Sequence, residues 1–322
     1  MRNQFPLPIV ITGTTAAGKT SLAFEIASHF QITNIVSCDS RQVYKHLDIV
    51  TGKDIPPGFQ FHQVSTYQNY TVGFYQGKFK NQNLRLWGFD LASPDQAFSV
   101  SNYYQLFFEQ ILPQINNTFI IVGGTGYYLK GLFSPQETFS ISPDNDLRSR
   151  LSSLSVIELQ SQLQSLNPVK YQSMNNSDQH NPRRLIRAIE VSQVETSQVN
   201  SYTSLNPLWI GIKPLTIELI DSLIEKRVKE RFSSQGLINE IKLIVENNWA
   251  NCIPASTLGY PQLIDYFQNK ISKEQALSLW TISEKQYARR QITWFKKQPQ
   301  INWFSRDSRN LVLDFLTSSF NL

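Results

Sequence analysis

The sequence predicts an α/β fold, with a parallel sheet flanked by helices and an all-helical insertion domain. Short β-rich runs alternate with helical patterns up to residue 133, which is typical of a parallel sheet wrapped by helices. Within this region, an apolar run at residues 9–12 leads straight into a glycine-rich turn and a helical pattern. From residue 134 to 204 the composition shifts to Ser, Gln, Asn and Leu without a convincing strand, which indicates the insertion.

The elements of the core follow from the spacing of apolar residues. Strands are expected at residues 9–12, 34–38, 118–122 and 208–212, and helices at residues 19–30, 99–115 and 126–133. Residues 59–90 are rich in Gln, Asn and Tyr and are expected to form antiparallel β-structure. Three helical segments are expected after residue 212, one of them with an apolar stripe over residues 237–245. The predicted domains are a core of residues 1–133 and 205–322 and a helical insertion of residues 134–204.

Composition excludes several classes of protein. The 322 residues suit one large domain with an insertion, or two domains. Cys38 and Cys252 cannot form a disulfide framework, and no Cys/His cluster has zinc spacing. A strand that begins by residue 9 leaves no room for a signal peptide, and no apolar run approaches membrane-spanning length. We therefore expect a cytoplasmic protein without membrane association, whose net charge of +5 is compatible with a polyanionic partner.

The turn after the first strand matches the phosphate-loop pattern G-x-x-x-x-G-K-[ST] without a substitution. Its residues are Gly13, Thr14, Thr15, Ala16, Ala17, Gly18, Lys19 and Thr20. In such a loop, successive backbone N–H groups form an anion nest, and the glycines let the main chain approach the ligand closely. Lys19 adds a positive charge, and the Thr20 hydroxyl can hold Mg2+. The core is therefore expected to be P-loop NTPase-like, while the motif itself specifies only a polyphosphate ligand.

The acidic residue that would complete the site is Asp39. A P-loop NTPase holds Mg2+ jointly with a carboxylate at the end of a neighbouring strand. The strand at residues 118–122 runs into Gly123-Gly124-Thr125-Gly126 and offers no acid, whereas the strand at residues 34–38 is followed directly by Asp39. Asp39 is thus the one acid that spacing places near the phosphates. It could be a metal ligand or a base acting on a group that attacks near the phosphate.

Five further segments follow the phosphate loop in a recognisable order. They are SCDSRQVYK (37–45) with LDI (47–49) and TGK (51–53), GGTGYYLK (123–130), NPRRLIRAIEV (181–191), LGY (258–260) and QYARRQITWF (286–295). In this order they resemble the motifs of tRNA dimethylallyltransferases, the IPP transferase family, from residue 8 to about residue 296. The chain is identified as a divergent, bacterial-type member.

The resemblance implies a prenyl transfer. Dimethylallyl diphosphate would be the donor, and the exocyclic N6 of the adenine at position 37, next to the anticodon of a tRNA, would be the acceptor. The phosphate loop, with Lys19, Thr20 and Mg2+, would then stabilise a diphosphate leaving group. Asp39 would be the base that accepts a proton from the adenine amine.

The same resemblance implies a set of tRNA contacts, in which the acceptor adenine is extruded into a pocket. The implied tRNA-binding residues are Asp39, Ser40, Arg41, Gln42, Thr125, Arg183, Arg184, Leu185, Ile186 and Arg187. The spacing of Lys285 and Arg289 on the closing helix adds a basic face that could lie along RNA phosphates. The expected partner is the anticodon stem-loop of tRNA, bound by a monomer.

One departure from the family concerns the diphosphate. Leu223 stands where relatives carry an arginine that contacts it, and Arg227 lies one turn later on the same helix face. Arg227 or the neighbouring Lys226 could take the place of that arginine, and we expect Arg227 to help bind the diphosphate.

Three other functions share these features. An adenylate prenyltransferase would use the same site on a free nucleotide, but it needs neither the insertion nor the basic closing helix. A small-molecule kinase, or an ATP-driven RNA-binding switch, would share the phosphate loop. The missing acid after residue 122 argues against the kinase and against the ATP-driven switch.

Overall fold

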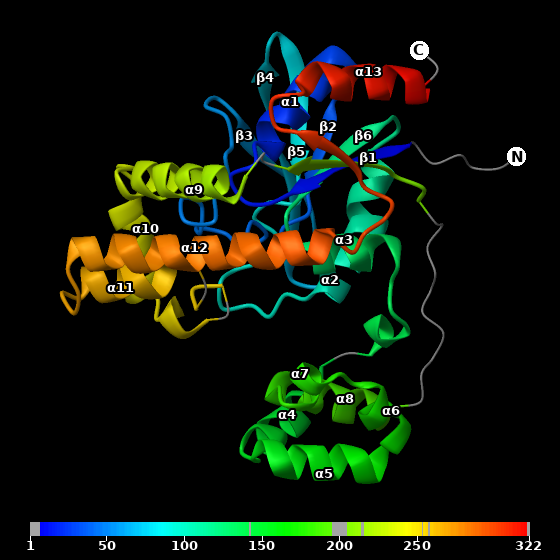
Figure 1. The fold of residues 1–322 in the computed structure, drawn as a ribbon, viewed down its shortest axis with the longest axis vertical. Coiled ribbons are helices and arrows are strands. Elements are labelled where there is room, and N and C mark those ends of the chain that lie inside the picture. The colour runs from blue at the N-terminus through cyan, green and yellow to red at the C-terminus, as the bar shows by residue number, and fades with distance from the viewer. Residues whose placement is uncertain are drawn as a thin grey trace, which may run out of the picture. The chain divides into compact units, whose positions relative to one another are not determined.

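The structure is a computed structural model that describes residues 7–141, 143–194, 205–213, 216–252, 254–256 and 258–320. The chain divides into two compact units (Figure 1). Unit 1 comprises Met1–Phe133 and Leu205–Leu322, and unit 2 comprises Ser134–Ser204.

Within the described residues, unit 1 is built on an eight-stranded sheet with the order β3-β4-β5-β2-β6-β1-β7-β8. The strands are β1 (Pro8–Gly13), β2 (Asn34–Ser37), β3 (Gln60–Tyr67), β4 (Tyr70–Phe79), β5 (Gln82–Trp87), β6 (Phe119–Gly123), β7 (Leu208–Lys213) and β8 (Asn302–Ser305). The strands from β5 to β8 in this order run parallel, and the predicted β1, β2, β6 and β7 are adjacent or nearly so at the centre. The α/β class is confirmed.

The antiparallel part of the sheet lies in residues 59–90, as expected. β3 pairs with β4 and β4 with β5, so the sheet is mixed. Two-residue turns at Gln68-Asn69 and Lys80-Asn81 join these strands, with φ positive at all four residues. Such turns match the twist of the strands, and Asn tolerates the left-handed backbone well.

Helices cover both faces of the sheet (Figure 1). On one face lie α1 (Lys19–His29) and α13 (Arg309–Phe320), which share a buried apolar cluster with the strands. On the other lie α2 (Val100–Leu106), α3 (Gly126–Phe133) and α12 (Lys273–Phe295). The expected helix at residues 99–115 is α2 followed by a wider turn at Phe107–Ile111 and a 3-10 turn at Leu112–Gln114. Pro113 explains the irregular end, because it lacks an N–H and its ring clashes with the carbonyl four residues earlier.

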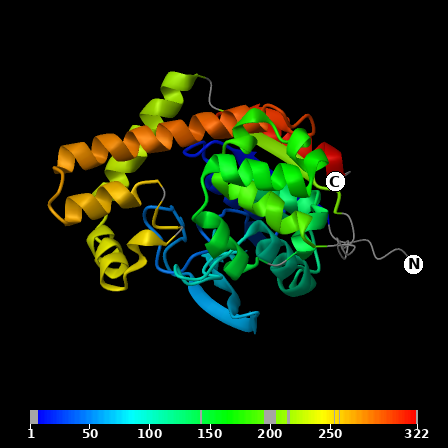
Figure 2. The same ribbon diagram turned by 90° about the horizontal axis from the view of Figure 1, so that it is seen from below.

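The chain after β7 departs from the expected three helical segments. The described residues form five α-helices, a 3-10 turn at Trp249–Asn251 and the edge strand β8. Besides α12 and α13, the α-helices are α9 (Ile217–Phe232), α10 (Leu237–Glu246) and α11 (Tyr260–Phe267). Helix α12 runs from α11 to the sheet (Figure 2) and packs along α9. Its length carries its C-terminal half to the strand ends of the sheet.

Unit 2 is helical throughout its described elements. After a 3-10 turn at Glu137–Ser140 come α4 (Asn145–Ser152), α5 (Val156–Leu166), α6 (Pro168–Ser173), α7 (Asn176–Gln179) and α8 (Pro182–Ser192). Each α-helix begins after a residue whose side chain caps its first amides: Asp144, Ser155, Asn167, Asn175 and Asn181. Asn, Ser and Asp are the preferred caps, so the polar composition of this stretch serves several short helices around one leucine-rich core.

Candidate active site

A cavity of about 460 Å3 lies in unit 1, where β1, β2 and β6 end. The carboxyl ends of parallel strands meet at one edge of a sheet, so the loops that follow them converge there. The phosphate loop follows β1, residues 39–54 follow β2, and Gly124 follows β6. Helices α9 and α12 close the cavity from the outside.

The phosphate loop has the backbone that its sequence requires. Gly13 has φ of 144°, and a Cβ atom at this position would lie 2.3 Å from the carbonyl oxygen of Ile212. Gly18 has φ of 90° and precedes α1, so the amides that open this helix have no intrahelical acceptor. Such amides form an anion-binding site at a helix N-terminus.

Not every residue of the loop faces the cavity. Thr15, Ala16, Gly18, Lys19 and Thr20 line it. Gly13, Thr14 and Ala17 do not line it, and the expectation that all eight residues bind the diphosphate stays a prediction. The Ala17 side chain is buried in the core, and its amide donates to the Thr14 carbonyl at 3.3 Å.

The surroundings of Lys19 disfavour its positive charge. Its Nζ donates to the Thr14 carbonyl oxygen at 2.7 Å. Burial, followed by the positive charge of Arg227, lowers the pKa of Lys19 to about 8. An anion bound beside Lys19 would relieve both effects, because it would stabilise the charged form.

A residue that sequence reasoning missed, Gln291 of α12, connects the phosphate loop to the loop after β6. Its Oε1 accepts the Thr15 amide at 2.7 Å, and its Nε2 donates to the Gly124 carbonyl at 2.8 Å. Gln291 lies in the segment QYARRQITWF, but the segment alone gave it no role. This side chain holds two of the cavity's walls together.

Helix α9 contributes arginines to the lining of the cavity. Nη1 of Arg227 donates to the Thr15 hydroxyl at 2.6 Å, so Arg227 reaches the phosphate loop. Leu223, one turn earlier, also lines the cavity. Arg231, one turn later and not singled out from the sequence, donates from Nη1 to the Val50 carbonyl at 3.0 Å.

Asp39 lines the same cavity as the phosphate loop. The Arg41 amide donates to its Oδ1 at 2.9 Å, which fixes one carboxylate oxygen. Arg41 and Gln42 also line the cavity, and Gln42 donates to the Gly52 carbonyl at 2.7 Å. Ser40 does not line it, and its amide donates to the Thr125 hydroxyl at 3.3 Å.

Asp39 is not the one acid near the phosphate loop, and that expectation is corrected. Among the described residues, three other carboxylates line the cavity: Asp54, Glu230 and Glu284. They come from the loop after β2, from α9 and from α12, so only the fold brings them together. Six cations line it as well: Lys19, Arg41, Lys226, Arg227, Arg231 and Arg306. Positive charge exceeds negative by two, which suits an anionic ligand.

The oxygen donors of the cavity fit Mg2+. Thr20 supplies a hydroxyl and Asp54 a carboxylate to one wall. No cluster of three or more His, Cys, Asp or Glu side chains exists among the described residues. Mg2+ commonly uses one or two protein ligands together with substrate phosphates and water, so a small donor set is suitable.

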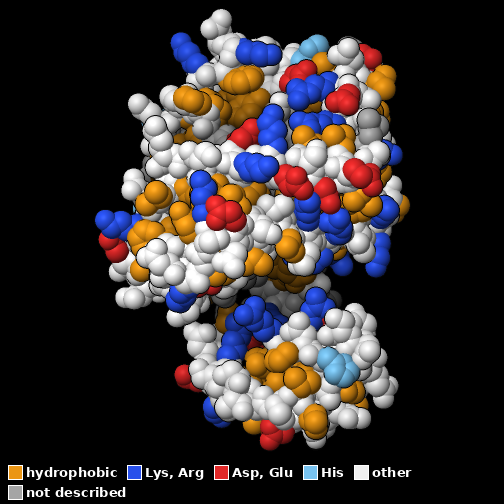
Figure 3. All heavy atoms as spheres, turned by 60° about the vertical axis from the view of Figure 1, so that its left-hand side comes forward, with side chains coloured by type: hydrophobic (Ala, Val, Ile, Leu, Met, Phe, Trp, Pro, Cys, Tyr) orange, Lys and Arg blue, Asp and Glu red, His pale blue; other side chains and the backbone are white. Residues whose placement is uncertain are grey.

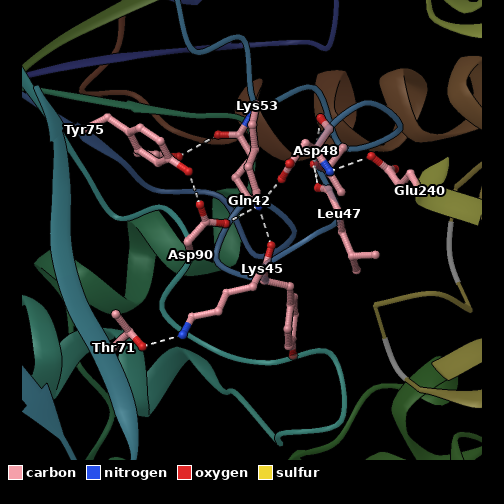
Figure 4. A network of polar contacts seen from close by, with 12 residues as sticks. Gln42, Lys45, Leu47, Asp48, Lys53, Thr71, Tyr75, Asp90 and Glu240 are labelled. Atoms are coloured by element: carbon pink, nitrogen blue, oxygen red, sulfur yellow. Dashed lines mark hydrogen bonds and ion pairs between the residues drawn. The ribbon is translucent and has the colours of Figure 1, made fainter. Parts of the chain in front are cut away.

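A buried polar network holds the loop of residues 42–54 against the body of unit 1 (Figure 4). Lys53 pairs with Asp48 at 2.6 Å and also with Asp90, and its side chain is 1% exposed. Glu240 of α10 accepts the amides of Asp48, Ile49 and Val50. The loop that carries Gly52 and Asp54 is therefore fixed from two sides.

The residues expected to bind tRNA in unit 2 have mixed surroundings. Arg183 is exposed, and Arg184 is exposed but paired with Asp178. Arg187 pairs with Glu190 and donates to the carbonyls of Thr138 and Ile141. The Leu185 side chain is fully buried in the core of unit 2, against which Ile186 packs, so the expectation that these two residues bind tRNA stays a prediction.

The basic face of α12 is paired with α9. Lys285 forms ion pairs with Glu225 and Asp221, and Arg289 pairs with Asp221. On the face shown in Figure 3, Lys and Arg side chains are interspersed with Asp and Glu over unit 1. These two cations therefore tie α12 to α9, and only their remaining exposed surface is available to an RNA phosphate.

Comparisons with known proteins identify a family and similar chains. The family model described as IPP transferase matches residues 42–298. A tRNA dimethylallyltransferase from Trichormus variabilis is 31% identical over 313 residues, covering 94% of this chain and 96% of that one. The crystal structure of a tRNA isopentenylpyrophosphate transferase from Staphylococcus epidermidis aligns with a TM-score of 0.62 and 26% identity, covering 98% of this chain and 99% of that chain. A eukaryotic dimethylallyltransferase acting on tRNA shares the fold, with a TM-score of 0.69, 19% identity, and coverage of 94% and 74%.

No helix in the part of the chain that the structure describes is long and apolar enough to cross a membrane. The phosphate loop, the acid after β2 and the helices that close the cavity occupy one site, and the similarity extends over nearly the whole chain. This chain belongs to the IPP transferase family.

Proposed function

We propose that this chain transfers a dimethylallyl group from dimethylallyl diphosphate to N6 of the adenine next to the anticodon of a tRNA. The products are N6-dimethylallyladenosine in the tRNA and free diphosphate. The observation that carries the proposal is the presence of Asp39 and the phosphate loop in one cavity with excess positive charge.

The donor side of the reaction needs stabilisation of negative charge. As the C–O bond to the diphosphate breaks, negative charge grows on the diphosphate and positive charge on the allyl unit. The amides at the start of α1, together with Lys19 and Arg227, are donors that are in position before the reaction begins. Preorganised donors of this kind are the main source of transition-state stabilisation.

The acceptor side needs a base. The adenine amine is a weak nucleophile because its lone pair is delocalised into the ring. A carboxylate that accepts its proton as the new C–N bond forms makes the attack easier. Asp39 has this role in the proposal, and the Arg41 amide orients its carboxylate.

Magnesium is proposed to bind beside the diphosphate. Thr20 would hold it together with the diphosphate oxygens, and Asp54 stands in the same wall. A bound Mg2+ would neutralise part of the charge on the leaving group.

The proposed acceptor is the anticodon stem-loop, bound by a monomer in the cytoplasm. The residues proposed to lie on the side of the site that binds the adenine are Ser40, Arg41, Gln42 and Thr125. The exposed Arg183 is a candidate for phosphate contact. Light scattering of the protein with and without tRNA would test the monomer.

A direct assay separates the candidate functions. The protein is incubated with Mg2+, dimethylallyl diphosphate and either unmodified tRNA or AMP, and the nucleosides are analysed by mass spectrometry. A five-carbon increment on a tRNA adenosine supports the proposal, and an increment on AMP alone supports an adenylate prenyltransferase. Consumption of ATP without an increment on either acceptor would instead indicate a kinase or ATPase.

A further inference from the structure

Helix α9 faces the cavity along three successive turns. Leu223, Arg227 and Arg231 are spaced by four residues, share one helix face and all line the cavity. The first of them is apolar, at the position where the family resemblance implies an arginine. The other two are cationic, and Arg227 already contacts the phosphate loop.

The Arg231 guanidinium is only partly bonded. Its Nη1 donates to the Val50 carbonyl, whereas its Nη2 is buried and has no hydrogen-bond partner among the described residues. A buried donor without an acceptor is costly, by roughly 1–3 kcal/mol, and charge raises the cost. Such a group in a native structure calls for an explanation, and a bound anion or water is one.

The two arginines of α9 are held close together. A Cβ atom built on Gly52 would lie 1.6 Å from Nη2 of Arg231 and 2.4 Å from Nη2 of Arg227, so these nitrogens are at most 4.0 Å apart. Gly52 thus leaves the space that both guanidiniums occupy. Burial, followed by the charge of Arg227, lowers the pKa of Arg231 to about 10. Both effects disfavour two adjacent cations unless an anion lies between or beside them.

We propose that Arg231 is a diphosphate-binding residue that supplies, two turns further along α9, the guanidinium missing at Leu223. This inference rests on the proposed function, because it assigns Arg231 to the same leaving group. Nη2 of Arg231 and Nη2 of Arg227 would donate to one diphosphate, while Lys19 and the loop amides hold it from the other side. Guanidinium groups suit phosphate oxygens because their donors form a planar fork.

The experiment measures the affinity for inorganic diphosphate by calorimetry, and KM for dimethylallyl diphosphate and for tRNA, in five proteins. These are the wild type, Arg231→Met, Arg231→Lys, the double variant Arg231→Met with Leu223→Arg, and Lys229→Met as control. Lys229 is an exposed cation of the same helix that does not line the cavity. We expect Arg231→Met to weaken diphosphate binding roughly 10- to 100-fold, the range for a charge-assisted hydrogen bond, with KM for tRNA unchanged. The diphosphate affinity of Arg231→Lys should lie between those of the wild type and Arg231→Met. The affinity of Lys229→Met should match that of the wild type.

The double variant tests whether an arginine at position 223 can replace the one at position 231. If an arginine at either position serves the diphosphate, Leu223→Arg should restore part of the lost affinity, whereas a merely structural Arg231 would not be rescued. Unchanged affinity in folded Arg231→Met, or an equal loss in Lys229→Met, overturns the proposal. Should Arg231→Met unfold, Arg231→Lys decides, since unchanged diphosphate affinity there also overturns it. A wild type that neither binds diphosphate nor prenylates tRNA would instead refute the proposed function.

Discussion

At its position in the cavity, Asp39 could act as a general base or as a metal ligand. Substitution of Asp39 distinguishes these two roles. Asp39→Asn keeps an oxygen that can accept the Arg41 amide, so the local geometry should persist. We expect turnover to fall by roughly two to four orders of magnitude, the usual contribution of a general base, with tRNA affinity near normal. Single-turnover rates and tRNA binding measure the two effects.

The control for that variant is Asp95→Asn, an exposed carboxylate that does not line the cavity. Full activity of Asp39→Asn would remove Asp39 from the mechanism. A parallel loss of Mg2+ and diphosphate affinity would reassign it as a metal ligand.

Gln291 offers a second test at this scale. In Gln291→Leu the Thr15 amide and the Gly124 carbonyl both lose their partner. Unsatisfied buried polar groups cost about 1–3 kcal/mol each, so we expect a loss of roughly 2–5 kcal/mol in the free energy of unfolding and a higher KM for dimethylallyl diphosphate. Urea denaturation and steady-state kinetics measure these effects, with the exposed Gln286→Leu on the same helix as control. Equal stability of the two variants would contradict the bridging role.

What the sequence could predict about the site depended on distance along the chain. The phosphate loop and Asp39 are local patterns, each attached to its own strand, and the structure places them in one cavity as expected. The bond between Thr15 and Gln291 joins residues that are 276 positions apart, and no spacing rule reaches that far. Asp54 and Arg231 were missed for the same reason, because each carries no local signal beyond its charge.

At the scale of elements, the loop after β2 depends on Lys53. Replacing Lys53 with Met leaves Asp90, whose side chain is 13% exposed, without its cation. Breaking a buried ion pair costs about 3–5 kcal/mol, so we expect a loss of that order in stability and a weaker hold on residues 48–54. Urea denaturation measures the stability, and hydrogen exchange of peptides from this loop measures the local effect. Lys78→Met, an exposed cation on β4, is the control, and a Lys53 variant as stable as this control would contradict the role.

Elements with strong periodicity were predictable, and irregular ones were not. The central strands are buried, apolar and close to their expected bounds. Strand β8 has four residues at the sheet edge, two of them aromatic, and only its pairing with β7 makes it a strand. The expected number of closing helices was too low: α11, with eight residues, and α13, which follows the edge strand β8, were not singled out from the sequence.

At the scale of the whole molecule, unit 2 is stabilised by a carboxylate of its own, that of Glu190. Glu190 is buried and accepts hydrogen bonds from Arg148, Arg187 and the Asp144 amide. Burial alone would raise the pKa of Glu190, but these hydrogen bonds outweigh it and lower the pKa below its usual 4.5. The unfolded chain therefore binds this proton more readily than the folded one, so the stabilisation is present above about pH 4.5 and is lost as pH falls through the folded pKa.

The corresponding prediction compares Glu190→Gln with the wild type by calorimetry of the full chain. At pH 7 we expect the transition of unit 2 to lose roughly 2–4 kcal/mol, since two arginines lose their counter-charge. The difference should shrink as pH falls from about 4.5 through the lower pKa of folded Glu190, where the wild-type carboxylate also becomes protonated. Asp146→Asn, an exposed carboxylate of the same unit, should show no such dependence. A difference in stability that stays constant with pH would contradict the stabilising role of the ionised Glu190.

The bridge from Gln291 to Thr15 has a consequence for protein synthesis. The ribosome adds Gln291 276 residues after Thr15 of the phosphate loop. A nascent or truncated chain that stops before residue 291 would carry an intact motif whose Thr15 amide has not met its acceptor. Such a fragment would match a motif search and still lack the built site, so the motif becomes part of a complete site only after residue 291 has been added.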